Sequence, residues 1–488
     1  MVLYSNIKSY NMFGDTIMII HIRNFGKIEK ADIDLSDFVV FVGENNSGKT
    51  YVMQLIYGLF SLIYDSRFLS DLADDIEDLI PELKDDKDVC FDSELTIKSD
   101  NVNFFERLQD IINDHIDHNK QRIIENTFHT IDLSIDTLRI EFSALHDSIS
   151  LTYESNEVKN REKGKSRTPS GKYSFRKNDK VKYSVSFVTS FVPHFINRVL
   201  RRELLSVLLS ELTDGIGTIR NMPEPGKNYI YLPASRSGIM LLYANYLSND
   251  TNNDTLDDIK IENQEVESPE NEYGLTQPIY DFLMFLLKHK NSEMIKEDNK
   301  KLLSFIDSHI IKGRMEKFGN SVRYLPEQTE RSIPIYLSSS LVSELAPIYQ
   351  ILSGIRRFSF IMYDEIETCQ HPTKQLQLAR LIMRMVNSGY KMMVSTHSDT
   401  MAVAINNLIT LSCKKHKEEL VQKMDYENED ILQTDNVRAY QFLIGENGKT
   451  VVKEVCGHFS VGSGFDFDLF NNTNEKIYQD AVMLSEVD

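Results

Sequence analysis

The chain has 488 residues, with 41% hydrophobic and 26% charged residues, proportions that predict a folded protein with a sizeable core. Its net charge of −19 argues against broad nonspecific binding of nucleic acid, although a local basic patch stays compatible with it. No C-x-x-C pair, leader pattern or apolar run of about 18 residues is evident, so we expect a cytoplasmic protein without a zinc site, a disulfide framework or a membrane span.

The first predicted elements lead to a phosphate-binding loop. Strands are predicted at 16–20 and 31–35, and a third, apolar strand covers 39–42. Residues 43–50 follow directly, read GENNSGKT and fit G-x-x-x-x-G-K-[ST] in full. Apolar residues at helical spacing come next, at 52–60. A strand, a glycine-rich loop and a helix in this order are what a phosphate-binding loop requires.

This loop predicts binding of ATP with Mg²⁺. The glycines let the backbone N–H groups turn toward an anion, and the start of the following helix favours negative charge. Lys49 is expected to contact the outer phosphates, and the hydroxyl of Thr50 is expected to bind the magnesium ion. A glycine-rich turn that matches by chance is the alternative. The remaining nucleotide-binding residues of this prediction are Gly43, Asn45, Asn46, Ser47 and Gly48.

The middle of the chain carries no such motif. Residues 1–60 are interpreted as the first part of an ATPase core and 61–225 as a mainly helical insertion. Within it, the basic segment 155–182 predicts a solvated loop, or else an electrostatic contact with nucleic acid or an acidic protein. Residues 226–240 return to the core with one strand, and 241–320 hold an acidic loop and a second helical insertion.

The rest of the core, 321–488, supplies acidic residues at a strand end. An apolar strand at 358–363 ends in Asp364 and Glu365. Asp364 is placed to hold magnesium beside Thr50, and Glu365 could polarise the attacking water as a general base. The alternative is a pair of acids at a strand end without a catalytic role.

A further strand, 391–395, ends just before His397, which could sense or polarise the region of the γ-phosphate. A structural histidine is the alternative. Residues 445–450 look like a second phosphate loop by eye, but two residues are missing between the glycines and no helix follows. This segment is therefore predicted to be a hairpin.

The motifs GENNSGKT, IMYDEIE followed by HP, and VSTHSD resemble the ABC-class ATPases of the SMC, RecF and OLD group. The likeness covers 1–60 and 330–410, and the segment at 23–28 is also similar. Residues 233–238, PASRSG, resemble a motif of bacterial stand-alone members. The resemblance implies an α/β fold: an ABC-type P-loop ATPase head with a mixed β-sheet and large helical insertions.

The resemblance also implies that two heads pair head to tail, so that a serine-containing signature of one completes the ATP site of the other. The candidates here are Ser338, Ser339 and Ser340. They depart from the usual Ser-Gly-Gly of the group because no glycine is present. A serine-rich helix cap is a competing interpretation.

Some members of this group carry a C-terminal Toprim nuclease domain with a D-x-D motif. Only residues 466–468, DFD, offer that spacing near the end of this chain, and too few residues follow the last predicted ATPase helix for such a domain. We therefore expect an ATPase without its own nuclease, similar to the ATPase subunits of PARIS defence systems. The resemblance implies a separately encoded Toprim-type nuclease effector, a phage trigger protein and a homo-oligomer built from head-to-tail pairs.

Other functions stay open at this point. A RecF-like or SMC-like DNA-repair ATPase would bind DNA as a dimer, but the acidity and the lack of a long coiled coil disfavour it. A transporter ATPase subunit fits least well. A scaffold that binds ATP without hydrolysing it is disfavoured by the intact Glu365.

Overall fold

A computed structural model describes most of the chain. Its contacts divide the chain into a first unit of residues 1–21, 59–121 and 137–217, and a second unit of residues 22–58, 122–136 and 218–488. The residues that the structure describes are 18–83, 94–98, 101–142, 149–156, 170–177, 180–188, 193–213, 216, 218–219, 226–234, 236–240, 275–318, 321–434, 436–455, 464–465, 478–480 and 482–484.

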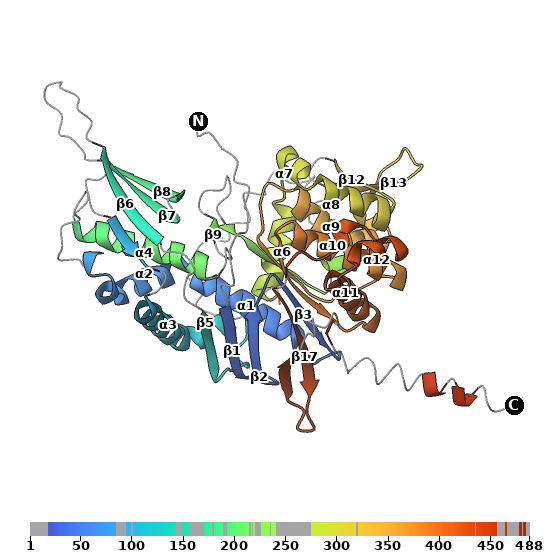
Figure 1. Cartoon of the computed structure of the whole chain (residues 1–488), viewed down its shortest axis with the longest axis horizontal. Helices are drawn as coiled ribbons and strands as arrows, with labels where there is room; N and C mark the ends of the chain where they lie inside the picture. The colour runs from blue at the N-terminus through green and yellow to red at the C-terminus, as the bar shows by residue number, and fades with distance from the viewer. Residues whose placement is uncertain are drawn as a thin grey trace, which may run out of the picture. The chain divides into compact units, whose positions relative to one another are not determined.

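A nine-stranded mixed sheet is the largest feature (Figure 1). β3 pairs in parallel with β16 on one side and β17 on the other, whereas β17 and β18 are antiparallel. Its strands, in spatial order, are β11 (Tyr229–Leu232), β15 (Phe360–Tyr363), β16 (Lys391–Thr396), β3 (Phe38–Gly43), β17 (Val437–Ile444), β18 (Thr450–Glu454), β2 (Ile28–Leu35), β1 (Met18–Phe25) and β5 (Thr137–Phe142).

β3 is buried along its whole length, as its unbroken apolar sequence requires of a central strand. Phe38, Val40 and Val42 belong to the core shared with the helices of the second unit, whereas Phe41 contacts the rings of Tyr440 and Phe442. The helices of this unit include α6 (Gln277–Leu287), α7 (Glu293–Asp298), α8 (Lys300–Phe305), α9 (Ser340–Ser353), α10 (Pro372–Asn387), α11 (Asp399–Ser412) and α12 (Lys417–Lys423).

Four neighbouring strands in this sheet run in parallel, so their carboxyl ends lie at one edge. β3 ends there at the phosphate-loop segment, which leads into α1 (Lys49–Ile63). β15 ends directly before Asp364, and β16 ends directly before His397. β11 ends before the PASRSG segment. The topology therefore brings four separate stretches of sequence to one place.

Smaller elements complete the second unit. A three-stranded antiparallel sheet contains β12 (Gly313–Phe318), β13 (Ser321–Pro326) and β14 (Ile333–Pro334). It follows a π-helix, η3 (Ile306–Ile311), and precedes the short helix η4 (Ile335–Leu337) that leads to α9. A two-stranded ribbon pairs β9 (Thr218–Ile219) with β10 (Gly226–Lys227).

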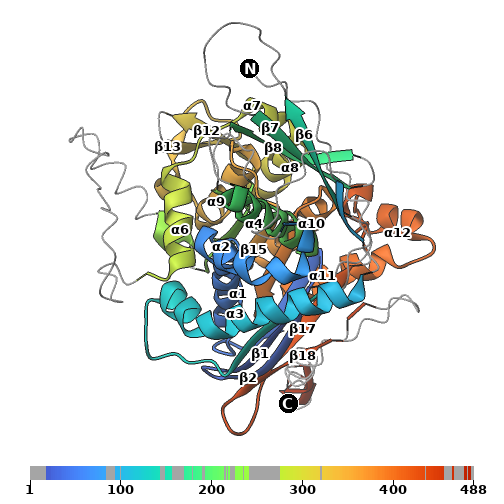
Figure 2. The same cartoon turned by 90° about the vertical axis from the view of Figure 1, so that its left-hand side faces the viewer.

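The first unit contains α2 (Ser66–Asp75) and α4 (Pro193–Leu212), which pack together (Figure 2), and most of α3 (Val102–Phe128). Arg201 of α4 is fully buried and donates to the carbonyls of Ala73 and Leu83, at 2.7 and 2.5 Å. No helix in the described part of the chain is long and apolar enough to cross a membrane. A four-stranded antiparallel sheet contains β4 (Glu94–Ile97), β6 (Ile149–Asn156), β7 (Ser170–Lys177) and β8 (Lys180–Val188).

The prediction of a mainly helical insertion at 61–225 did not include these strands. β5 also lies in this stretch, at the edge of the large sheet. Its six residues alternate between more exposed and buried positions, which is the period-2 pattern of a strand and not the spacing of a helix. The basic segment 155–182 is not a loop throughout, because β7 and part of β8 lie within it.

Other predictions fall partly or wholly outside the described residues. They concern 157–169 of the basic segment, the acidic stretch around 249–273 and the DFD motif at 466–468. The hairpin predicted at 445–450 is confirmed, since β17 and β18 pair on either side of it. The strand expected within 226–240 is also confirmed as β11, and Pro372 is the first residue of α10.

Candidate functional site

The phosphate-loop segment has a backbone that requires glycine at two positions. Gly48 has φ +97°, and a Cβ there would lie 2.6 Å from Ile28 Cδ1. At Gly43 a Cβ would lie 2.9 Å from the Cβ of Phe442 and 3.0 Å from its carbonyl oxygen. Asn46 has φ +60°, a conformation that asparagine tolerates better than most residues. The spacing of the motif thus matches a real constraint on the chain.

Lys49 is buried inside this loop. Its ammonium donates to the carbonyls of Gly43 and Glu44, both at 2.8 Å. Burial lowers the pKa of Lys49, while the carboxylates of Asp364 and Glu365 oppose this shift. The side chain therefore lies within the loop that its predicted ligand would enter, close to the acidic strand end.

Asp364 is fully buried and accepts hydrogen bonds from three hydroxyl groups. Thr50 Oγ1 and Tyr231 OH donate to Oδ2, at 2.7 and 2.8 Å. The hydroxyl of Ser395 donates to Oδ1. The loop threonine and the strand-end aspartate, 314 residues apart in sequence, are thus in direct contact.

Glu365 follows in a left-handed conformation, with φ +44°. Its N–H donates to Ser395 Oγ at 2.8 Å, and its carbonyl accepts from Arg236 at 3.0 Å. Burial and the neighbouring charge of Asp364 raise the pKa of the Glu365 carboxyl. Its side chain is 34% exposed, whereas its main-chain N–H and carbonyl are both held by hydrogen bonds.

Glu367 and His397 form an ion pair next to this acid. Glu367 Oε1 accepts from His397 Nδ1 at 2.9 Å and from the N–H groups of His397 and Ser398, at 2.7 and 3.1 Å. Burial by itself would raise the pKa of Glu367, but the hydrogen bonds from His397 bring it below its usual value. The bond to Glu367 in turn raises the pKa of His397.

His397 also lies near the predicted base, with Nδ1 4.0 Å from Glu365 Oε1. Lys49, Thr50, Asp364, Glu365 and His397 therefore gather at one edge of the sheet. Their catalytic roles stay predictions, because proximity alone does not establish them.

The predicted signature serines occupy a different position. Ser339 precedes α9 as its N-cap residue but forms no side-chain cap bond, and both Ser339 and Ser340 are exposed. Ser338 donates to the carbonyl of Ile335 at 2.5 Å. Helix capping by Ser339 is therefore absent from the described contacts. Two exposed apolar residues, Tyr336 and Leu337, directly precede the serines.

A family model described as an AAA ATPase domain matches residues 16–402. The chain belongs to this family. The comparison with curated proteins gave no match.

Several solved structures show a distant likeness to this AAA ATPase domain protein. One is an Smc head bound to the C-winged helix domain of ScpA, with TM-score 0.35, 11% identity, and coverage of 92% of this chain and 99% of that chain. The SMC head domain from Thermotoga maritima has TM-score 0.33 and 10% identity, with coverage of 91% of this chain and 100% of that chain. An Smc head with an extended coiled coil, bound to the C-terminal domain of ScpA derived from Pyrococcus furiosus, has TM-score 0.33 and 11% identity. The match covers 91% of this chain and 97% of that chain.

Sequence reasoning missed five residues of the site in this AAA ATPase domain. Glu367 could have been found from the D-E-I-E pattern, which places a third acid near the first two. Ser395 carried a weaker signal, its position two residues before His397. The other three come from segments whose neighbours only the fold defines. The five are Tyr231, Arg236, Glu344, Glu367 and Ser395.

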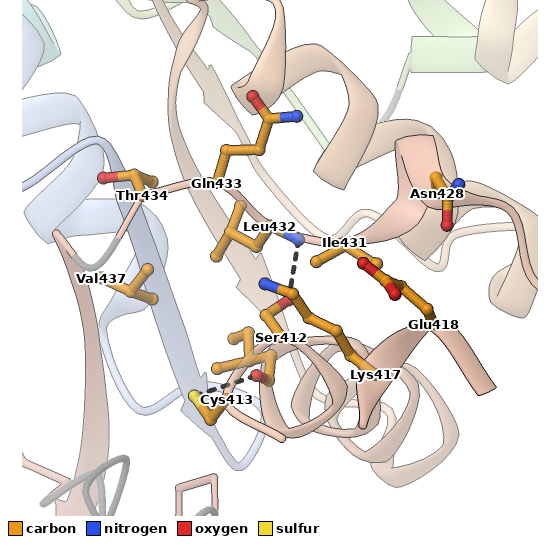
Figure 3. A pocket seen from close by; sticks show the side chains of 11 residues that line it. Ser412, Cys413, Lys417, Glu418, Asn428, Ile431, Leu432, Gln433, Thr434 and Val437 are labelled. Carbon is orange, nitrogen blue, oxygen red and sulfur yellow. Dashed lines mark hydrogen bonds between the residues drawn. The ribbon is translucent and has the colours of Figure 1, made fainter. Parts of the chain in front are cut away.

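A cavity of about 680 Å³ lies elsewhere in the second unit (Figure 3). Side chains of α11 and α12 line it together with the segment that precedes β17, and Leu432 N–H donates to Ser412 Oγ at 2.7 Å. Val437 lines this cavity and pairs with Phe38 at the start of β3, whereas the phosphate loop follows the other end of that strand. The cavity is therefore separate from the candidate ATP site.

Proposed function

We propose that this AAA ATPase domain protein binds and hydrolyses ATP at the edge where β3, β15 and β16 end. The contact of Thr50 with Asp364 carries the proposal. It joins the hydroxyl of the phosphate loop to the acid of the neighbouring strand, the arrangement that ATP with magnesium requires. Lys49 is held within the same loop.

The donor set fits a magnesium ion. Thr50 Oγ1 and Asp364 Oδ2 are hard oxygen donors 2.7 Å apart, and Mg²⁺ takes few protein oxygens when phosphates supply others. When bound, the ion would neutralise charge on the β- and γ-phosphates. Tyr231 and Ser395 donate to the same carboxylate and would orient it for this task.

Glu365 is the proposed general base, and His397 is the proposed γ-phosphate sensor. The raised pKa of Glu365 keeps its carboxylate a better proton acceptor than an ordinary glutamate. The raised pKa of His397 favours an imidazolium, which suits an anionic phosphate. Both side chains are about one-third exposed, so a substrate could reach them.

A second copy of the chain is proposed to complete the site. Among the residues that the structure describes, Ser339 and Ser340 are exposed at the start of a 14-residue helix, where N–H groups and hydroxyls suit a phosphate oxygen. The exposed Tyr336 and Leu337 beside them suit an interface. ATP would then favour a head-to-tail pair, either alone or within a larger ring.

A mixing experiment tests this pairing. Ser339 and Ser340 are replaced together by Phe, and this variant is mixed with Lys49→Ala. Each variant alone should lack ATPase activity, whereas a mixed pair regains one complete composite site. Failure to recover activity, with mixed assembly confirmed, would reject the role of the serines in trans.

The pairing is further proposed to control a separately encoded toxic effector, a Toprim-type nuclease, that a phage signal releases. The likeness of the motifs to defence ATPases supports this step, and ATP can act in this way only if the two assemblies contact the effector differently. The test is co-purification of a nuclease encoded beside this gene with wild type and with Lys49→Ala. We expect capture by wild type alone, and equal capture by both would reject ATP control.

A further inference from the structure

Arg236 is completely buried next to the candidate site, although the sequence motifs assign it no role in ATP chemistry. Its Nη1 donates to the carbonyl of Asp364 at 2.6 Å and to that of Pro233 at 2.7 Å, and its Nη2 donates to the carbonyl of Glu365 at 3.0 Å. One guanidinium therefore holds two successive carbonyls of the acidic strand end. These contacts lie where Glu365 has its left-handed φ of +44°.

The same guanidinium has a second partner on α9. Arg236 Nε lies 2.6 Å from Oε2 of Glu344, which is 1% exposed. The other oxygen of Glu344 accepts from the N–H of Ser237, at 3.0 Å, and from the Ser237 hydroxyl. Glu344 is thus fixed on both sides by the PASRSG segment.

Glu344 lies about one helical turn beyond Ser340, where α9 begins. The exposed start of α9 and the main chain of Glu365 are therefore connected through two buried side chains. Arg236 also stacks over the Tyr363 ring, with its central carbon 4.6 Å from the ring centroid. Because the guanidinium group is planar and its donors are rigidly spaced, a shift of one hydrogen-bond partner changes the geometry of the contacts with the other partners.

We propose that Arg236 is a positioning residue that couples α9 to the catalytic carboxylate through its ion pair with Glu344. This inference rests on the proposed function, because it needs Glu365 as the base and the start of α9 as a phosphate contact. Contact between the start of α9 and the ATP bound by a partner copy would shift Glu344. Arg236 would transmit this shift to the main chain of Glu365. Each copy would then become hydrolytically competent when it is paired.

The experiment compares Arg236→Lys, Glu344→Gln and the double variant. Lys at position 236 keeps the positive charge but lacks the several planar donors of the guanidinium. Gln at position 344 keeps the shape of glutamate but lacks its negative charge. We expect each variant to lower kcat roughly tenfold or more, within the range of typical coupling effects, while the Kd for ATP changes less than about threefold. The double variant should be no slower than the slower single variant, because both break one connection.

Arg384→Lys is the matched control. Arg384 is also a buried arginine, paired with Asp430 at 2.7 Å and lying 4.0 Å from the Phe305 ring centroid, but it contacts no residue of the site in the described contacts. It should keep the wild-type kcat. Thermal melts show whether either Lys variant is folded, so that Arg236→Lys still decides the matter if Glu344→Gln does not fold.

The outcomes separate the two proposals. A folded Arg236→Lys with wild-type kcat, or a kcat loss matched by Arg384→Lys at equal stability, would overturn the role of Arg236 alone. Multiplying losses in the double variant would do the same. Wild-type protein that binds but does not hydrolyse ATP would instead reject the proposed function.

Discussion

Glu367→Gln offers a direct test of the ion pair beside the candidate base. The change keeps the side-chain oxygen but removes its negative charge. Oε1 of Glu367 accepts three hydrogen bonds, from His397 Nδ1 at 2.9 Å and from the N–H groups of His397 and Ser398, at 2.7 and 3.1 Å. In this variant the pKa of His397 should therefore fall toward its usual value, and the free energy of unfolding should decrease.

The magnitude follows from burial. Hydrogen bonds to charged groups contribute about 1.5–3 kcal/mol. Glu367 is 5% exposed but His397 is 36% exposed, so solvent weakens the interaction on one side. We therefore expect a loss of about 1 kcal/mol in the free energy of unfolding.

The sign with pH is fixed by both shifts. The pKa of His397 is raised above its usual 6.5, so its contribution is complete below that pH and is lost as pH rises through the higher folded value. The pKa of Glu367 is lowered below 4.5, so its contribution is present above that pH and is lost as pH falls through the lower folded value. The pair stabilises the protein fully between these two usual values.

Chemical denaturation at about pH 6 and about pH 9 measures the effect. The difference between wild type and Glu367→Gln should shrink at the higher pH. Glu141→Gln is the matched control, since Glu141 also pairs with a histidine, His21, at 3.1 Å, but is 59% exposed. It should change stability by only a few tenths of a kcal/mol. Equal losses at both pH values in Glu367→Gln would refute the reasoning.

Lys49→Ala should reduce ATP affinity sharply in calorimetry, and unchanged affinity in folded protein would reject the site. Asp364→Ala should weaken ATP binding only when magnesium is present. Glu365→Gln should keep ATP bound but slow turnover by about 10²–10⁴-fold in a phosphate-release assay, whereas an unchanged rate would remove the general base. Wild-type turnover should fall as pH drops through the raised pKa of Glu365, because the base must be ionised. Gly48→Ala should impair ATP binding, since its φ of +97° disfavours a side chain.

The contacts of the site show how far local patterns reach. Some features are contained within a few successive residues and can therefore be predicted from the sequence. They are the glycines of the phosphate loop, the apolar strands and the acids that follow a strand. The stretch at 137–142 shows the opposite case. Its alternation of buried and more exposed residues is local too, but it follows the long helical pattern of α3, and the helical period does not describe it.

The sequence by itself determined the phosphate-loop motif, the acids at 364 and 365 and the α/β class, because motif spacing and apolar periodicity are properties of residues that are close along the chain. Only the tertiary structure decided that Tyr231 donates to Asp364, 133 positions away, and that Arg236 contacts Glu365, 129 positions away. The parallel order of β11, β15, β16 and β3 creates these contacts by bringing strand ends to one edge. No local pattern encodes which strands become neighbours, since pairing depends on how the whole core packs.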